Sequence, residues 1–180
     1  EDGDGRIDHV TVYATQGFDK QAQQAMGTLK KLWGTGGHDI QTVLIGIGQP
    51  QDYGGFVMRD GQAPALAQSR TWRSVTPYVL TRHPKKNGKD SPISQVARDL
   101  LRRGFPMPER VEPLDYAKIS GKKVRWLEFR RFRNRGGGQL ADSRGFGFEI
   151  VFAEPVRGPI ALGYGCHFGL GQFVAVEDLQ

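Results

Sequence analysis

The chain has 180 residues, which is enough for one large domain or two small ones with a hydrophobic core. Hydrophobic residues make up 38% of it, and no apolar run reaches the length of a membrane-spanning helix, so we expect a soluble protein. The single cysteine, Cys166, excludes an internal disulfide framework and is typical of the reducing cytoplasm, while the net charge of +6 favours an acidic partner.

The N-terminal part of the sequence predicts two strands around a helix, followed by a long loop. Apolar and polar residues alternate over residues 7–14, which predicts a strand. Apolar residues recur at helical spacing over residues 18–33, which predicts an amphipathic helix. Residues 40–47 are apolar enough for a central strand. Residues 49–68 are rich in Gly, Pro and Asp and predict a loop, with a short edge strand at 56–58.

The middle of the sequence predicts a strand, a helix and a second strand. Residues 71–80 have strand character, although Pro77 must lie at an edge, an end or a bulge because it lacks an N–H group. Ser91 is suited to cap a helix over residues 92–103. A basic strand is predicted over residues 122–133.

The last predicted elements are a flexible turn and three strands, over residues 134–143, 146–152, 160–164 and 173–176. This order of elements predicts an α+β fold of tandem ferredoxin-like (RRM-like) βαββ units with antiparallel sheets. The first unit, which is abbreviated, would comprise residues 1–70 with its long loop at 49–70. The second unit would comprise residues 71–180 and end in a glycine-rich loop.

Basic residues are concentrated at positions 118–135, before the last strands. Glu128 is the one acidic residue among its cations, and Trp126, Phe129 and Phe132 are interleaved with them. Cations that hold phosphates beside aromatic rings that stack on bases are typical of nucleic-acid binding, and a solvated basic face is the alternative interpretation. The cations are Lys118, Lys122, Lys123, Arg125, Arg130, Arg131, Arg133 and Arg135.

Residues 158–173 (GPIALGYGCHFGLGQF) contain five glycines that alternate with apolar and aromatic residues. Glycines in this number indicate a backbone that turns tightly or approaches another group closely. Because successive backbone N–H groups can form an anion-binding concavity, this stretch favours a polyanionic ligand.

Neither acidic nor sulfur-containing residues predict a metal site. The opening EDGDGRIDH matches part of a calcium loop, but Thr11 stands where the closing glutamate should be. Cys166 has no cysteine partner and lies next to His167, which is not zinc-binding spacing. We therefore expect no metal and no cofactor.

Four stretches resemble one protein family: Ile7–Asp8–His9, residues 72–79 (WRSVTPYV), residues 82–85 (RHPK) and residues 158–173. In these stretches the chain resembles the C-terminal half of the fused CRISPR-associated protein of type I-G (formerly I-U) systems. That protein joins a backbone-subunit domain to a repeat-processing endoribonuclease of the RAMP superfamily. The resemblance extends over essentially all 180 residues and is most specific in the glycine-rich loop.

The resemblance implies a metal-independent endoribonuclease that cuts CRISPR repeat RNA and stays bound to the product in an effector complex (Cascade). In that family the 2′-hydroxyl beside the scissile bond attacks its own phosphate and leaves a 2′,3′-cyclic phosphate. Such chemistry requires a general base, often a histidine, and a cation near the developing charge. The implied partners are CRISPR repeat RNA and other Cascade subunits, including a backbone-subunit domain fused or associated at the N-terminus.

The histidines are the candidates for the general base. His83 has the best local chemistry, because it lies between Arg82 and Lys85 where the chain leaves a strand, although it could bind phosphate only. His38 lies in a glycine turn where some members of the family carry their histidine, and it could equally be an ordinary loop residue. His9 on the first predicted strand favours a structural role. We expect His83 or His38 to act as the base, with Lys85 as the nearby cation.

The remaining candidate site residues are expected to bind RNA, and they are Arg82, Lys86, Lys122, Lys123, Arg125, Arg130, Arg131, Arg133, Arg135, Gly163, Gly165, His167, Phe168, Gly169 and Gly171. Because RAMP folds also serve as scaffolds, a non-catalytic guide-RNA-binding subunit of an effector complex is the alternative. A general single-strand binder is a third, weaker interpretation.

Overall fold

The computed structural model describes residues 9–33, 39–53, 65–85, 90–119, 122–129 and 144–176. It contains antiparallel sheets and few helices, so the predicted α+β class is confirmed. Within the described ranges, no helix is long and apolar enough to cross a membrane. In chain order the elements are α1 (Lys20–Thr28), β1 (Lys31–Leu32), β2 (Ile40–Gln41), α2 (Pro50–Tyr53), β3 (Gln68–Ser74), β4 (Tyr78–Val79), α3 (Pro92–Arg102), β5 (Arg110–Leu114), β6 (Tyr116–Ile119), β7 (Lys122–Arg125), the 3₁₀ helix η2 (Trp126–Phe129), β8 (Gly145–Arg157), β9 (Ile160–Ala161), the 3₁₀ helix η3 (Cys166–Phe168) and β10 (Gln172–Ala175).

The main sheet is organised around the long strand β8. Its order is β4-β8-β3-β10-β9, with β5 also paired to β8. Ile150 of β8 lies opposite Trp72 of β3 and opposite Val111 of β5, and all these pairings are antiparallel. Ferredoxin-like units are not evident from this sheet order among the residues that the structure describes.

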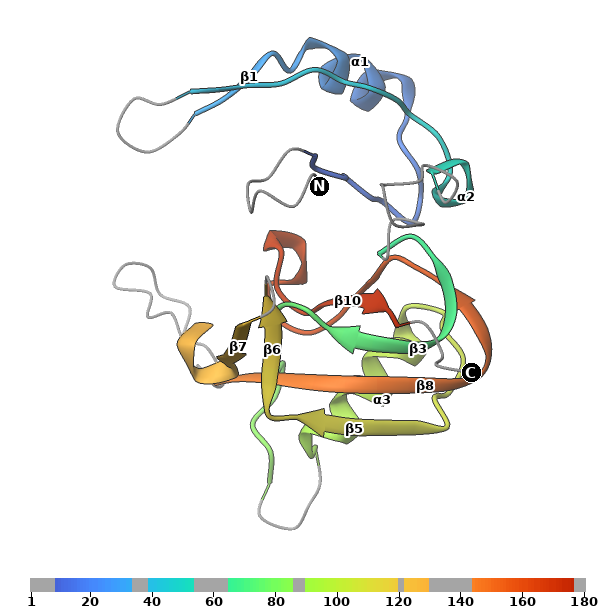
Figure 1. The fold of residues 1–180 in the computed structure, drawn as a ribbon. Coiled ribbons are helices and arrows are strands. Elements are labelled where there is room, and N and C mark those ends of the chain that lie inside the picture. Colours follow the sequence, from blue (N-terminus) through green and yellow to red (C-terminus); the bar gives the residue numbers. More distant parts are fainter. Residues whose placement is uncertain are drawn as a thin grey trace.

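Helix α3 covers one face of the main sheet (Figure 1). Its Val96 and Leu100 are buried against side chains of the sheet, including Trp72, Phe148 and Ile150. Alternation along a strand places every second residue on the same face, and this explains why Phe148 and Ile150 both reach the core. Burial of these large side chains is the main source of the stability of this part of the chain.

The helix predicted over residues 92–103 is confirmed. The hydroxyl oxygen of Ser91 accepts a hydrogen bond from the main-chain N–H of Ser94 over 3.2 Å, and Pro92 occupies the first turn. The neighbouring strand prediction, residues 71–80, is realised as two strands, because β3 and β4 are separated at Val75–Pro77. Strand β5 was not predicted at all, since its sequence RVEPL lies in a proline-rich stretch.

The N-terminal helix is shorter than predicted. Helix α1 begins after Asp19, whose carboxylate caps the N–H of Ala22 over 2.7 Å, and it ends at Thr28 because Leu29 is extended. The predicted last turn of the helix instead contains β1, which pairs with β2.

Two predicted N-terminal strands are wrong over the described residues. Residues 9–14 form no strand, and the strand predicted at 40–47 is limited to Ile40–Gln41. The physical reason is that no described strand pairs with 42–47, so side chains such as Val43 and Ile45 are exposed rather than central. Figure 1 shows this N-terminal part, in blue to cyan, as a layer separate from the main sheet. The edge strand predicted at 56–58 lies outside the described residues.

The basic strand predicted over residues 122–133 is wrong at Trp126–Phe129, where η2 replaces it, and its residues 130–133 lie outside the described residues. The indole Nε1–H of Trp126 donates to the carbonyl of Leu114 over 2.7 Å, and the ring packs on Gly147. The carboxylate of Glu128 accepts from the N–H of Arg125 over 3.1 Å. These contacts turn the chain out of the strand direction.

Candidate functional site

The glycine-rich segment is an ordered loop whose shape depends on glycine at two points. Gly163 and Gly171 have φ values of +84° and +60°, a region that favours glycine. A Cβ on Gly171 would lie 1.8 Å from the carbonyl oxygen of Leu162, and one on Gly163 would lie 2.7 Å from that of Val79. The backbone therefore packs too closely at both places for any side chain.

The loop presents polar and aromatic groups on its outer side. Phe168 is 90% exposed, and His167 and Tyr164 are also exposed. The guanidinium of Arg103, at the end of α3, donates to Sγ of Cys166 over 3.0 Å and brings a further cation to this loop. An exposed ring on a fixed backbone, with a cation nearby, is suited to stacking on a nucleobase.

Two backbone hydrogen bonds attach the loop to β4. The N–H of Tyr164 donates to the carbonyl of Val79, and the N–H of Gly171 donates to that of Pro77, both over 2.9 Å. The basic segment at 82–85 follows β4 directly, and three Cα–Cα steps separate Val79 from Arg82, a span of at most about 11 Å. The glycine-rich loop and the basic segment therefore emerge from neighbouring points of the fold.

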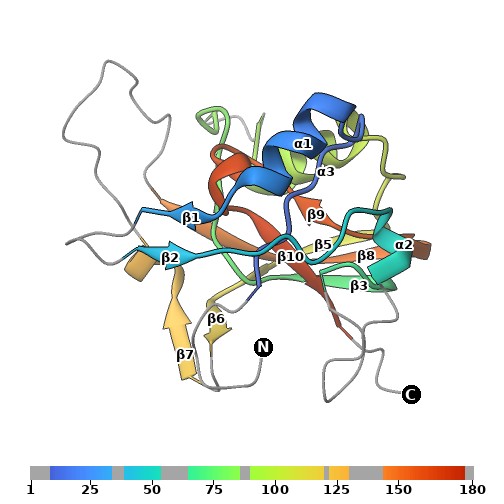
Figure 2. The same cartoon turned by 90° about the horizontal axis from the view of Figure 1, so that it is seen from above.

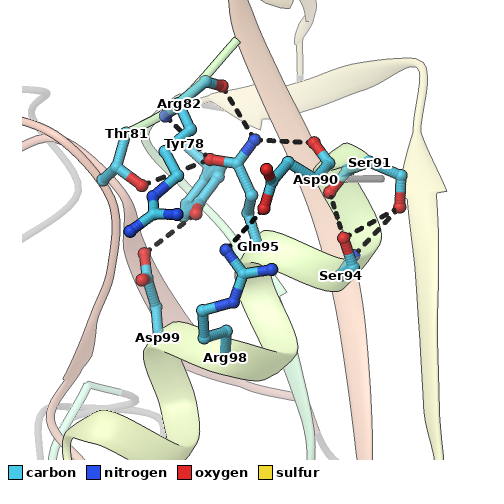
Figure 3. A network of polar contacts seen from close by, with 9 residues as sticks. All are labelled: Tyr78, Thr81, Arg82, Asp90, Ser91, Ser94, Gln95, Arg98 and Asp99. Atoms are coloured by element: carbon cyan, nitrogen blue, oxygen red, sulfur yellow. Dashed lines mark hydrogen bonds and ion pairs between the residues drawn. The ribbon is translucent and has the colours of Figure 1, made fainter. Parts of the chain in front are cut away.

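The basic segment carries Arg82, His83 and Lys85, all three exposed to solvent. The side chain of Gln95 on α3 bonds the main chain of Arg82, as Figure 3 shows. Arg82 precedes His83 and Lys85 follows it two residues later, so an anion bound at His83 would lie near two positively charged residues.

Strands β6 and β7 form a two-stranded basic ribbon, visible in Figure 2 as a projection from the main sheet. Its register places Lys118 opposite Lys123 and Tyr116 opposite Arg125, so these four residues share one face. Lys123 Nζ lies 4.4 Å from the centroid of the Tyr116 ring, a cation–π contact. Like charges directly opposite each other are destabilising unless an anion lies between them. This face therefore suits a polyanion.

The ribbon leads into the same part of the fold as the two loops. Trp126 follows β7, and a Cβ added to Gly145 would lie 2.6 Å from Cβ of Pro77 and 3.2 Å from the main-chain oxygen of Trp126. Pro77 and the main chain of Trp126 therefore both lie beside Gly145 at the start of β8, and the carbonyl of Pro77 also bonds the glycine-rich loop. The basic segment and the glycine-rich loop therefore adjoin β4, and the end of the ribbon lies beside Gly145, which also borders Pro77.

The predicted site residues divide into those that the structure places and those outside the described ranges. Around β4 it brings together Arg82, His83, Lys85, Gly163, Gly165, His167, Phe168, Gly169 and Gly171, whereas Lys122, Lys123 and Arg125 lie on the ribbon. His38, Lys86, Arg130, Arg131, Arg133 and Arg135 lie outside the described residues. His9 is exposed and belongs to no helix or strand, so the expected structural role on a strand is wrong.

Sequence reasoning missed Arg103 and Gln95. Arg103 had a visible signal, because a cation in the last turn of a helix before Gly104 faces the helix C-terminus. Gln95 had none, since a polar residue at this spacing on a helix is usually solvated, whereas here it is 1% exposed.

Two ionisable groups beneath the basic segment have shifted pKa values. Burial, and then the negative charge of Asp99, raises the pKa of the Tyr78 hydroxyl well above its usual range. Its hydroxyl donates to Asp99 over 2.9 Å. The hydrogen bond from Arg98 lowers the pKa of Asp90, which keeps that carboxylate charged. Tyr78 is thus neutral and Asp90 ionised at neutral pH.

Comparisons with protein-family models, with curated proteins and with solved structures found no match to this chain. Among the described residues, no group of three or more His, Cys, Asp or Glu side chains is placed to hold a metal ion. The site offers cations, exposed aromatic rings and a tightly folded glycine backbone. This combination suits a ligand that carries both phosphates and bases.

Proposed function

We propose that this chain binds RNA across the surface around β4 and acts as an endoribonuclease that matures CRISPR repeat RNA. The observation that carries the proposal is that the basic segment and the glycine-rich loop adjoin β4, while the end of the basic ribbon lies near Pro77 on the other side of Gly145. They come from distant parts of the sequence, and each has the composition of a nucleic-acid contact. A solvated basic face would need no such arrangement.

Each element has its own part in RNA binding. The ribbon face with Lys118, Lys123 and Arg125 holds stem phosphates, and the glycine-rich loop holds the strand beside the cut. Val79, which bonds the loop, and Arg82 of the basic segment are at most about 11 Å apart, a separation that a short stretch of one RNA strand can span. One strand can therefore contact the basic segment and the loop together.

The proposed reaction is attack by the RNA on itself. His83 takes the proton of the 2′-hydroxyl, the 2′-oxygen forms a bond to phosphorus, and the bond from phosphorus to the 5′-oxygen breaks. The 5′-oxygen takes a proton from solvent, and the product keeps a 2′,3′-cyclic phosphate. Lys85 offsets the negative charge that builds on the phosphate oxygens. His38 is the alternative base.

A second candidate function, a non-catalytic guide-RNA-binding subunit of an effector complex, is favoured by the N-terminal part. Trp33, Val43 and Ile45 are 88%, 79% and 76% exposed. Apolar side chains gathered at a surface often mark a protein–protein contact. Assembly with Cascade subunits, a backbone-subunit domain among them, would cover them.

The same proposal includes a tandem ferredoxin-like arrangement, a division of the chain between residues 70 and 71, and a cytoplasmic location. The resemblance to the type I-G endoribonuclease supports all three.

The test is incubation of the purified protein with repeat RNA in EDTA, followed by product analysis on a denaturing gel. Wild-type protein should give products with a 2′,3′-cyclic phosphate, and His83→Ala should cut at least 100-fold more slowly with unchanged RNA affinity. Lys20→Ala, on the exposed side of α1, is the matched control and should cut like wild type.

The outcomes separate the two candidate functions. Unchanged cleavage in both His83→Ala and His38→Ala would remove the assignment of the base. Tight repeat binding without any cleavage, together with co-purification of backbone subunits, would favour the non-catalytic subunit. Equal affinity for unrelated single strands would indicate a general RNA binder.

A further inference from the structure

The side chain of Gln95, on α3, forms hydrogen bonds to the main chain at both ends of the connection between β4 and α3. It is 1% exposed, and its amide makes four hydrogen bonds, to Thr81 and Arg82 where the segment begins and to Asp90 after it (Figure 3). Oε1 accepts from Thr81 Oγ1 over 3.2 Å and from the N–H of Arg82 over 3.0 Å. Nε2 donates to the carbonyls of Arg82 and Asp90, each over 2.8 Å. One side chain thus joins the two ends of the connection between β4 and α3.

Only a carboxamide of this length satisfies these partners. The main chain of Arg82 offers one donor and one acceptor, and Asp90 offers a second acceptor, so the matching group needs both an oxygen and an NH₂. A carboxylate would lack the donors, and an apolar side chain would leave buried main-chain groups unpaired, which is destabilising.

At the α3 end of the connection, Asp90 is fixed by further contacts besides its hydrogen bond to Gln95. Asp90 has a φ of 59°, and its carboxylate accepts from Nη1 of Arg98 over 2.7 Å. Ser91 then caps α3. Asp90 therefore keeps one backbone conformation, and its carbonyl stays aimed at Gln95.

These hydrogen bonds fix the backbone of Arg82 and so limit the movement of its neighbour His83. Both main-chain polar groups of Arg82 bond the same side chain, so its backbone cannot rotate without breaking two hydrogen bonds. Fixing a flexible residue in a single backbone conformation when a ligand binds costs conformational entropy. A segment that is already fixed avoids that loss on binding.

We infer that Gln95 is a positioning residue, which presents Arg82, His83 and Lys85 to the RNA without touching it. The inference rests on the proposed function, because the orientation matters only if this segment meets RNA. Loosening the segment should weaken both RNA affinity and the alignment of His83 with the 2′-hydroxyl.

The experiment compares Gln95→Met and Thr81→Val with a control on the same helix, Asp99→Asn. Gln95→Met keeps the volume and loses all four hydrogen bonds, while Thr81→Val loses one and leaves the core of the protein untouched. Asp99 lies on the same helix as Gln95. Asp99→Asn alters its contact to the buried Tyr78 of β4 but leaves the hydrogen bonds of Gln95 to the basic segment in place.

Three quantities are measured for each protein: the rate of trypsin cleavage after Arg82, the repeat-RNA Kd, and the single-turnover cleavage rate at saturating RNA. Gln95→Met should raise the trypsin rate at least tenfold, because cleavage requires local opening. It should weaken RNA binding about three- to tenfold and slow cleavage at least tenfold. Thr81→Val should show changes of about two- to threefold, and Asp99→Asn should match wild type in all three when compared below the melting temperature of each.

Wild-type RNA binding and cleavage in Gln95→Met or in Thr81→Val, with trypsin sensitivity unchanged, would overturn the inference and leave the proposed function standing. Equal losses in Asp99→Asn would also overturn it, because they would indicate general destabilisation. If wild-type protein binds no repeat RNA, the proposed function fails and the inference fails with it. Should Gln95→Met not fold, Thr81→Val decides.

Discussion

The main-chain N–H of Gly171 donates a hydrogen bond to the carbonyl oxygen of Pro77 over 2.9 Å. Pro77 has no N–H of its own and interrupts the predicted strand, yet its carbonyl remains available at the break. Next to it, the N–H of Gln172 donates to the hydroxyl of Thr76 over 2.9 Å. The break between β3 and β4 is therefore the place where the glycine-rich loop joins the sheet.

Gly171→Ala should destabilise the protein by about 2–4 kcal/mol, because the new Cβ meets the Leu162 carbonyl and the left-handed conformation adds strain. Gly169→Ala is the matched control. Gly169 also has a positive φ, +85°, but no atom lies within 4 Å of an added Cβ, so a loss of only about 1–2 kcal/mol is expected. Urea unfolding measures both. Equal losses would show that close packing at Gly171 contributes nothing.

Lys123→Ala should weaken RNA binding, and the slope of log affinity against log salt should become shallower by about one unit, as expected for one lost phosphate contact. Lys123 lies on the cationic face of the basic ribbon opposite Lys118. Filter binding between 50 and 300 mM salt, a range over which such contacts weaken strongly, measures the slope. Lys30→Ala, beyond the end of α1, should leave it unchanged, and an unchanged slope in Lys123→Ala would exclude the ribbon from RNA contact.

Tyr78→Phe should change how stability depends on alkaline pH. The pKa of Tyr78 is raised on folding, mainly by burial, so the folded state keeps its proton after the unfolded chain loses it near pH 10. This contribution to stability is complete below pH 10 and falls as the pH rises above it. Urea midpoints between pH 8 and 11 should therefore drop more steeply for wild type than for Tyr78→Phe. Parallel curves would contradict the assignment.

Gly147→Ala should displace the indole of Trp126, since a Cβ on Gly147 would lie 2.0 Å from its Cζ2 atom. We expect a loss of about 1–3 kcal/mol and a more exposed Trp126. Acrylamide quenching of tryptophan fluorescence in a Trp33→Phe background detects the exposure. Gly27→Ala in α1, where nothing lies within 4 Å, should raise helix stability slightly and leave the quenching unchanged.

The elements that could be predicted are those specified by local chemistry. Ser91 before Pro92, with apolar residues at helical spacing, predicted α3 because capping and amphipathic periodicity act within a few residues. The glycines of the 158–173 stretch likewise predicted a tight backbone, which the close approach of Gly171 to Leu162 confirms.

The N-terminal strand predictions failed for the opposite reason. The apolar composition of residues 42–47 favours a strand. A strand also needs a neighbouring strand to pair with, and no strand in the described part of the chain pairs with these residues. At Trp126 a tertiary contact with Gly147 overrode the strand pattern. Pairing and packing depend on residues far away in the sequence, so local patterns cannot settle them.

The sequence by itself determined the α+β class, helix α3, the basic character and the glycine requirement of the last loop. Only the tertiary structure decided that the basic segment and the loop adjoin β4 with the end of the basic ribbon near Gly145, and that Gln95 joins the two ends of the connection between β4 and α3. The physical reason is the separation along the chain over which each interaction acts. Propensity, capping and charge act between neighbours, whereas the hydrogen bonds of Gly171, Tyr164 and Gln95 exist only after β8 has brought β3, β4 and β5 into one sheet.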